Sequence, residues 1–237
     1  MPRCSWHICY YKLLMQNKKL TLNFYGKDSI RCISIAKEIK MRFELGQIYH
    51  VYNRGNNKQP IFFNEGNYLF FIRKMRKVLL PNCEILAYCL MPNHFHFLIY
   101  ANEITVSNNE KDKNNFSESI RKLLSQYTKA VNIQQGRTSS LFQQNTKAKL
   151  VTNVCHEHRG MVQSSCHDVR GRTIQSTALN CFIYIHKNPI GLKCGNLSNW
   201  QFSSYLDYAG IRNGTLCNKE LTYSLLGFQQ NEFVKFF

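Results

Sequence analysis

Two short apolar segments joined by a Pro-Asn turn constrain the fold of this 237-residue chain more than any other feature. Residues 83–91 run apolar and short, as a buried strand does, and residues 94–100 form a second such run. Pro92-Asn93 lies directly between them, and a two-residue connection between apolar runs is typical of an antiparallel hairpin. The core is therefore expected to form around a β-sheet that contains this hairpin.

The second strand of the hairpin carries two histidines, His94 and His96. Side chains alternate faces along a strand, so both share a face with Leu98, whereas Phe95 and Phe97 point to the opposite, core face. Histidines two positions apart lie roughly 6–7 Å from each other, close enough for one metal ion to bind between them. A strand histidine is more often an ordinary packed residue, so the pair alone is a weak sign of a metal site.

The segments around the hairpin have the periodicity of an α+β protein. Residues 47–53 alternate as a strand, and a helix with apolar spacing follows Asn64. A second helix opens at Ser117, and the basic residues 147–151 resemble an edge strand. This order predicts a ferredoxin-like fold, which is an antiparallel sheet with helices on one face.

Two further helices are expected beyond that unit, over residues 176–188 and 200–208. Pro189 ends the first one, because proline disfavours helical backbone at the residue before it. Tyr184 and Asn188 are four positions apart in this helix, so they lie on one face. Taken alone, Tyr184 would more often be a core aromatic, and Asn188 an ordinary residue at a helix end.

Changes in composition divide the chain into segments. The compact domain is expected over residues 41–228, preceded by a poorly defined extension over 1–40 and followed by a tail over 229–237. Residues 155–176 show no periodicity and are interpreted as an inserted loop. A zinc site is conceivable there, although the spacing fits no zinc pattern; its candidate ligands are Cys155, His156, His158, Cys166 and His167.

The charge of the chain favours a polyanionic partner. A formal charge of +17 and a pI near 9.5 indicate nucleic acid first and an anionic membrane surface second, although a basic protein that binds neither is the simpler alternative. The apolar runs are too short for a spanning helix, and the N-terminus lacks a secretory signal. Ten scattered cysteines without a CxxC pair then favour reduced thiols and a cytoplasmic location.

The strand with His94 and His96 and the helix with Tyr184 and Asn188 together form a specific constellation. It resembles that of the REP-associated tyrosine transposases, which belong to the single-tyrosine HUH transposases. The resemblance covers roughly residues 41–154 and 177–228. Its motifs are YHVYNRGNN at residues 49–57, LMPNHFH at 90–96, GRTSSLFQ at 136–143, YIHKNP at 184–189, and the segment 200–210.

The resemblance implies cleavage and joining of single-stranded DNA on a ferredoxin-like fold. By position, His94 and His96 would ligate a divalent metal ion, Mg²⁺ or Mn²⁺, and Asn188 would be the third residue on the metal side. Tyr184 would be the nucleophile that becomes joined to the DNA 5′-phosphate. This chemistry is reasonable, because a phenol with a pKa of about 10 needs activation and a polarised phosphate at neutral pH.

The expected partner is single-stranded or hairpin DNA, and monomer and homodimer both remain open. Phosphate contacts are expected from Arg54, Lys58, Lys147 and Lys149, although each could be only a solvated charge.

The sequence leaves several alternatives open. Tyr127 is a rival nucleophile, and His186 is expected to pack or to contact DNA. The segments 1–40 and 155–176 have no counterpart in the resemblance and could impair activity. A non-catalytic module that binds single-stranded nucleic acid is therefore the main alternative function, and a replication initiator or relaxase is a third.

Overall fold

The computed structural model describes residues 43–107, 115–151, 174–192 and 196–237. The chain divides between Ile39 and Lys40 into two units, and every described residue belongs to the second one. The extension expected over 1–40 lies outside the described residues, as does nearly all of the loop expected over 155–176. The zinc hypothesis also falls there, with Cys155, His156, His158, Cys166 and His167.

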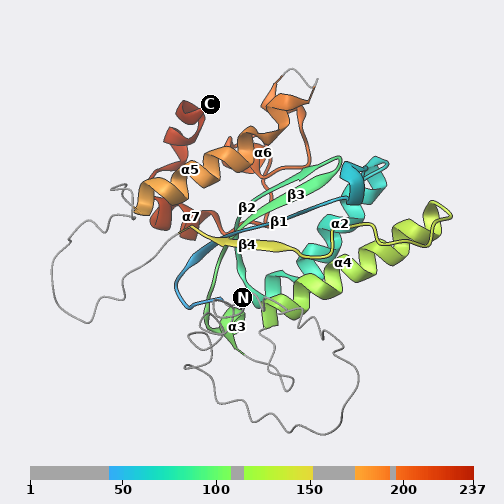
Figure 1. Cartoon of the computed structure of the whole chain (residues 1–237). Helices are drawn as coiled ribbons and strands as arrows, with labels where there is room; N and C mark the ends of the chain where they lie inside the picture. Colours follow the sequence, from blue (N-terminus) through green and yellow to red (C-terminus); the bar gives the residue numbers. More distant parts are fainter. Residues whose placement is uncertain (1–42, 108–114, 152–173, 193–195) are drawn as a thin grey trace, which may run out of the picture. The chain divides into compact units, whose positions relative to one another are not determined.

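Four antiparallel strands form one sheet in the order β2-β3-β1-β4 (Figure 1). The strands are β1 (Ile48–Arg54), β2 (Glu84–Met91), β3 (His94–Tyr100) and β4 (Lys147–Leu150). Helix α2 (Glu65–Val78) lies between β1 and β2 in the chain, and α4 (Asn115–Gln134) lies between β3 and β4. This order and pairing are those of a ferredoxin-like unit, so the predicted α+β class is confirmed.

Shorter elements surround this unit. A two-residue turn joins β2 to β3, as predicted, and Met91 pairs with His94 across it. The remaining helices are η1 (Asn56–Lys58), η2 (Leu80–Asn82), α3 (Glu103–Val106), α5 (Ile174–Lys187), η3 (Asn188–Gly191), η4 (Leu197–Asn199), α6 (Tyr205–Tyr208), α7 (Lys219–Leu226) and η5 (Gln230–Phe236). None of the helices in the described part of the chain is long and apolar enough to cross a membrane.

One face of the sheet packs against α2 and α4. Phe95 and Phe97 are fully buried there, and the ring of Phe71 from α2 lies 5.8 Å and 6.4 Å from theirs. Tyr127 from α4 meets the same Phe71 ring edge-on at 4.8 Å. The alternation of β3 therefore places the phenylalanines in the core, as the sequence pattern predicts.

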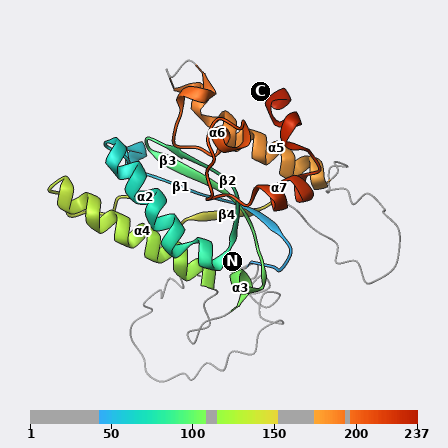
Figure 2. The same ribbon diagram turned by 180° about the vertical axis from the view of Figure 1, so that it is seen from behind.

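The opposite face of the sheet is partly covered by α5. The prediction placed the helices on one face; α2 and α4 do share a face, whereas α5 lies against β2 and β3 from the other side (Figures 1 and 2). The histidines of β3 point to this second face, because they alternate with Phe95 and Phe97. The side chains of α5 and the two histidines are consequently brought together.

The segment after α5 covers the outer edge of β2. The prediction of a helix over residues 200–208 is wrong for its first half, because only Tyr205–Tyr208 is helical. The backbone amide of Leu90 donates to the carbonyl of Phe202, and that of Ser204 donates to the carbonyl of Tyr88. Backbone groups that bond to a strand edge cannot also form helical hydrogen bonds, so the pairing with β2 overrides the helical pattern.

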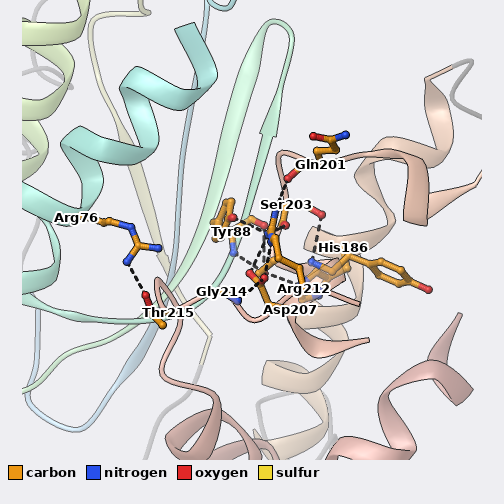
Figure 3. A network of polar contacts seen from close by, with 11 residues as sticks. Arg76, Tyr88, His186, Gln201, Ser203, Asp207, Arg212, Gly214 and Thr215 are labelled. Atoms are coloured by element: carbon orange, nitrogen blue, oxygen red, sulfur yellow. Dashed lines mark hydrogen bonds and ion pairs between the residues drawn. The ribbon is translucent and has the colours of Figure 1, made fainter. Parts of the chain in front are cut away.

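A buried ion pair holds this C-terminal segment in place (Figure 3). Asp207 is 2% exposed, and its carboxylate accepts from Arg212 Nε at 2.6 Å and from Arg212 Nη2 at 2.9 Å. Arg212 Nη2 also donates to the hydroxyl of Tyr88 at 3.0 Å and to the carbonyl of Ser203 at 2.7 Å. The guanidinium therefore joins β2 to the segment that covers it.

Replacing Arg212 with methionine is expected to lower the free energy of unfolding by about 3 kcal/mol, because Asp207 would remain buried without its counterion. This is the low end of the range for broken buried pairs, since the Arg212 side chain is 34% exposed. Arg121→Met is the matched control. It breaks the surface pair with Glu118 and should cost about 1 kcal/mol or less. Equal losses in urea unfolding would contradict this structural role.

The last nine residues pack onto the domain instead of forming a free tail. Helix η5 lies in this segment, and its Phe233 is fully buried. The Phe233 ring lies 5.9 Å from that of Phe182 in α5 and 5.5 Å from that of Tyr208. The expected tail over residues 229–237 is thus held against α5 by Phe233, the buried residue of this segment.

Candidate active site

His94 stands at the start of β3 with its ring orientation fixed by Asn93. Its Nδ1 lies 2.6 Å from Asn93 Oδ1, and Asn93 Nδ2 donates to the carbonyl of Lys58 at 3.1 Å. The second contact orients the Asn93 amide, so its oxygen can only accept from His94. His94 therefore carries its proton on Nδ1, which leaves the lone pair of Nε2 free.

Asn188 presents an oxygen to that free nitrogen. Its Nδ2 donates to the carbonyls of Tyr184 at 2.8 Å and Ile185 at 3.4 Å, in the last turn of α5. This fixes the amide so that Oδ1 points away from the helix and lies 3.4 Å from His94 Nε2. The two nearest atoms of His94 and Asn188 are thus both hydrogen-bond acceptors.

A cation can bridge two acceptors that face each other. Ligands about 2.1 Å from one ion, at angles between square and tetrahedral, lie about 3.0–3.4 Å apart, and the separation of His94 Nε2 from Asn188 Oδ1 falls in this range. The donor types also fit, because imidazole nitrogen and amide oxygen both ligate divalent ions. The pair formed by His94 and Asn188 is therefore suited to hold a metal ion.

His96 supplies a third donor next to this pair. Its ring centroid lies 5.0 Å from that of His94, and Asn188 is among the side chains that influence its pKa. Its Nδ1 lies 2.8 Å from His50 Nε2, so Nε2 is the nitrogen left for Asn188 or a metal. Burial, reinforced by the neighbouring histidines, lowers the pKa of His96 to about 3, and burial also lowers the pKa of His94. Both rings are consequently neutral near pH 7, as metal ligands must be.

One of these three donors is the amide oxygen of Asn188, whereas many metal sites use only histidine, cysteine and carboxylate side chains. Among the residues that the structure describes, no group of three or more such side chains could hold a metal ion. The Asn188 oxygen would be the third protein donor beside His94 and His96.

Tyr184 stands over the histidine cluster, which consists of His50, His94 and His96, and is 52% exposed. Its ring meets the rings of His96 at 5.6 Å and His50 at 6.0 Å, edge-on in both cases. The helical spacing places it one turn before Asn188, as the sequence predicts. The phenol is thus both accessible to a ligand and adjacent to the donor atoms.

The two other candidate side chains, Tyr127 and His186, are buried in the protein core. Tyr127 is fully buried and donates to the carbonyl of Ile61 at 2.7 Å, and burial raises the pKa of its hydroxyl. His186 is also fully buried; its Nδ1 donates to the carbonyl of Phe182, and its Nε2 lies 2.7 Å from Ser204 Oγ. Tyr127 cannot reach a DNA strand, and His186 packs in the core.

Three of the four predicted phosphate contacts share the face of the histidines. Arg54 lies opposite His94 across β1 and β3, and Lys147 and Lys149 lie opposite Tyr52 and His50 across β1 and β4. Side chains directly opposite in an antiparallel pair point to the same side. This face therefore presents an arginine and two lysines around the candidate site.

Lys58 is the fourth predicted phosphate contact. It is exposed in η1, and its carbonyl accepts the hydrogen bond that orients Asn93. Its backbone therefore supports His94, whereas a role of its side chain in binding DNA stays a prediction.

His50 belongs to the cluster but was not identified from the sequence. It is buried in β1, between Lys149 and Leu98 in the sheet, and its ring stacks on that of His96 with centroids 5.0 Å apart. The only available signal was its alternation with Tyr52 in β1, which does not reveal which residues of β3 lie opposite. Its pKa is lowered to about 4, first by burial and then by the charge of Lys149.

The metal-free protein is expected to lose stability in acid. Burial lowers the pKa of His186 to about 3, and those of His50 and His96 to about 4 and about 3. An unfolded chain protonates these rings near pH 6.5, at about the ordinary histidine value. The unfolded state thus binds more protons between about pH 6.5 and pH 4, so stability falls as pH falls through this window.

Thermal unfolding in a chelator, measured from about pH 7.5 to about pH 4.5, tests this expectation. The midpoint should drop in acid, and His186→Phe should make the drop shallower because one of the three protonations is removed. A midpoint that stays level through this range would contradict the neutral, buried state of these histidines.

Comparisons with known proteins find similarity only among solved structures. No protein-family model matches the chain, and no curated protein does. The fold is similar to a solved structure described as the REP-associated tyrosine transposase bound to a REP hairpin, with a TM-score of 0.49 and 14% sequence identity. The match covers 83% of this chain and 98% of that chain. An identity this low carries no information about activity, which has to be inferred from this chain's own residues.

Proposed function

We propose that this chain is a metal-dependent endonuclease and strand transferase for single-stranded DNA, a transposase that acts through a 5′-phosphotyrosine intermediate. The observation that carries the proposal is the position of the exposed Tyr184 phenol beside the facing acceptors of His94 and Asn188. A purely structural tyrosine would be expected in the core, where Tyr127 is found.

The charges around the site support a DNA substrate. Arg54, Lys147 and Lys149 share the face that holds Tyr184, and the whole chain carries a formal charge of +17. Lys147 Nζ also lies 6.0 Å from the ring centre of Tyr52, so a cation and an aromatic ring are adjacent on this face. Basic and aromatic side chains together bind the phosphates and bases of single strands. We therefore propose that the strand runs over β1 and β4 towards Tyr184.

The proposed reaction exchanges one phosphodiester for another. Tyr184 Oη forms a bond to phosphorus as the bond from phosphorus to the 3′-oxygen breaks, and the phenolic proton is lost. The released 3′-oxygen takes up a proton, and the 5′-phosphate remains on the tyrosine. Because the phosphotyrosine is itself a phosphodiester, a 3′-hydroxyl can later attack it and join a new strand.

The protein contributes position and protonation state to this reaction. Asn93 keeps the His94 Nε2 unprotonated, and the backbone of α5 keeps the Asn188 oxygen turned towards it. Mg²⁺ or Mn²⁺ bound by His94, His96 and Asn188 would polarise the phosphate and offset its developing negative charge. Two imidazole donors favour Mn²⁺ over Mg²⁺, which prefers oxygen ligands.

A covalent adduct with DNA tests the proposal. Hairpin oligonucleotides with single-stranded flanks, taken from the sequence around the gene, would be labelled at either end and incubated with protein and Mn²⁺. Attachment through the 5′-phosphate should transfer the 3′ label to the protein on a denaturing gel, and the 5′ label should appear on a shortened free strand. EDTA should stop both.

The alternative function predicts a different result. A non-catalytic module would shift the same oligonucleotides on a native gel but leave both labels on intact DNA. That outcome with every flanking sequence, with Mn²⁺ present, would replace the endonuclease with a protein that only binds single strands.

A further inference from the structure

His50 makes a direct contact with a proposed metal ligand without being one of the three donors. His50 Nε2 lies 2.8 Å from His96 Nδ1, with both side chains buried and the rings inclined by only 25°. Two imidazoles at this distance share one hydrogen, since a nitrogen lone pair on each side would be repulsive and two N–H groups would clash. The position of that hydrogen determines what His96 can do.

The two placements of the hydrogen have opposite consequences. If His50 donates from Nε2, then His96 accepts at Nδ1 and, as a neutral ring, carries its own hydrogen on Nε2. The nitrogen left for the metal would then be blocked. If His96 donates from Nδ1, its Nε2 keeps a free lone pair, as a ligand requires.

The neighbouring ligand already shows the second arrangement. His94 donates from Nδ1 to Asn93 Oδ1 at 2.6 Å, and its Nε2 faces Asn188. His94 and His96 thus both use Nδ1 for a supporting contact, His94 to Asn93 and His96 to His50. Outer partners of this kind commonly set the orientation and the protonated nitrogen of metal-binding histidines.

We propose that His50 is a positioning residue that accepts the Nδ1 hydrogen of His96 and so keeps His96 Nε2 free and directed at the metal position. This inference rests on the proposed function, because it assigns a role towards the same metal site. The close contact between the two buried rings, 2.8 Å from nitrogen to nitrogen, is the observation that carries it.

Two substitutions separate hydrogen bonding from packing. His50→Gln keeps an acceptor oxygen at about the distance of Nε2, whereas His50→Phe fills the space without any acceptor. Tyr52→Phe is the matched control, because Tyr52 lies on the same strand with its ring 5.8 Å from that of His96 and loses only its hydroxyl. All three proteins would be compared with wild type by circular dichroism for folding.

The first measurement reads the hydrogen position directly, in metal-free protein. Nitrogen-15 NMR of the histidine rings should show His96 protonated on Nδ1 in wild type, Tyr52→Phe and His50→Gln. In His50→Phe, the Nε2 form should appear. A wild-type spectrum with His96 protonated on Nε2 would overturn the proposal, because His50 would then be the donor.

The second measurement is Mn²⁺ affinity by electron paramagnetic resonance. His50→Phe should bind Mn²⁺ about 10–100-fold more weakly than wild type, the usual effect of losing an outer partner, and His50→Gln should recover most of the affinity. Unchanged affinity in folded His50→Phe would refute the inference while leaving DNA cleavage intact. Spin-echo detection of a third coordinating imidazole, lost in His50→Phe, would also refute it by making His50 a ligand.

The outcomes distinguish this inference from the proposed function. A wild-type protein that forms the DNA adduct but shows no difference among the His50 variants retains its function and loses this role for His50. A wild-type protein that binds no Mn²⁺ and forms no adduct overturns both.

Discussion

Tyr184→Phe is expected to bind DNA and Mn²⁺ as wild type does and to form no covalent adduct. The substitution removes only the phenolic oxygen, which is the atom proposed to bond to phosphorus. Because the side chain is 52% exposed, packing of α5 should survive, and the free energy of unfolding should change by less than about 0.5 kcal/mol. The expected loss is therefore complete for cleavage and negligible for the fold.

Two other tyrosines serve as controls for this result. Tyr52→Phe removes a hydroxyl from the same face of the sheet and should retain the adduct, with at most weaker DNA binding. Tyr127→Phe should also retain it, although its buried hydrogen bond to Ile61 would be lost, at a cost of about 1–3 kcal/mol. An adduct formed by Tyr184→Phe at the wild-type rate would exclude Tyr184 as the nucleophile.

His94→Ala is expected to abolish Mn²⁺ binding and cleavage while leaving the protein folded. The ring lies on the α5 face of the sheet, opposite the core phenylalanines, and one of its nitrogens faces Asn188 across 3.4 Å. DNA binding should persist, because the proposed phosphate contacts come from Arg54, Lys147 and Lys149 and not from the proposed metal site. Metal content, adduct yield and a native-gel shift measure the three effects separately.

Phe97→Ala is the matched counterpart on the same strand. Phe97 is fully buried against α2, so its truncation should lower the free energy of unfolding by about 3–5 kcal/mol. Any folded fraction should still bind Mn²⁺. The reverse pattern, in which His94→Ala unfolds the protein and its metal content stays unchanged, would show that His94 is structural.

Local sequence patterns were sufficient for the ferredoxin-like unit. The hairpin of β2 and β3 follows from two apolar runs around Pro92-Asn93, and α2 begins where Asn64 accepts a hydrogen bond from the amide of Asn67. These features depend on residues within a few positions of each other. The pairing of Tyr184 with Asn188 is equally local, because helical spacing alone places them together.

The features that were missed depend on contacts between distant parts of the chain. His50 reaches His96 only because β1 pairs with β3 in a register that sets Tyr52 opposite His96, and nothing near His50 in sequence specifies that register. Ser203 and Ser204 leave the helical pattern because their backbone pairs with the edge of β2, more than a hundred residues earlier in the chain. Phe233 is buried because its ring packs against Phe182 of α5 and Tyr208 of α6.

The identity of the residue that attacks DNA tests the proposed mechanism most directly. Wild-type protein would be incubated with Mn²⁺ and a hairpin oligonucleotide, the trapped adduct digested with nuclease and protease, and the modified peptide sequenced by mass spectrometry. We predict that Tyr184 carries one nucleotide, joined to its hydroxyl oxygen through the 5′-phosphate. Modification of another tyrosine, or unmodified tyrosines throughout a protein that binds the same DNA, would contradict the proposed mechanism.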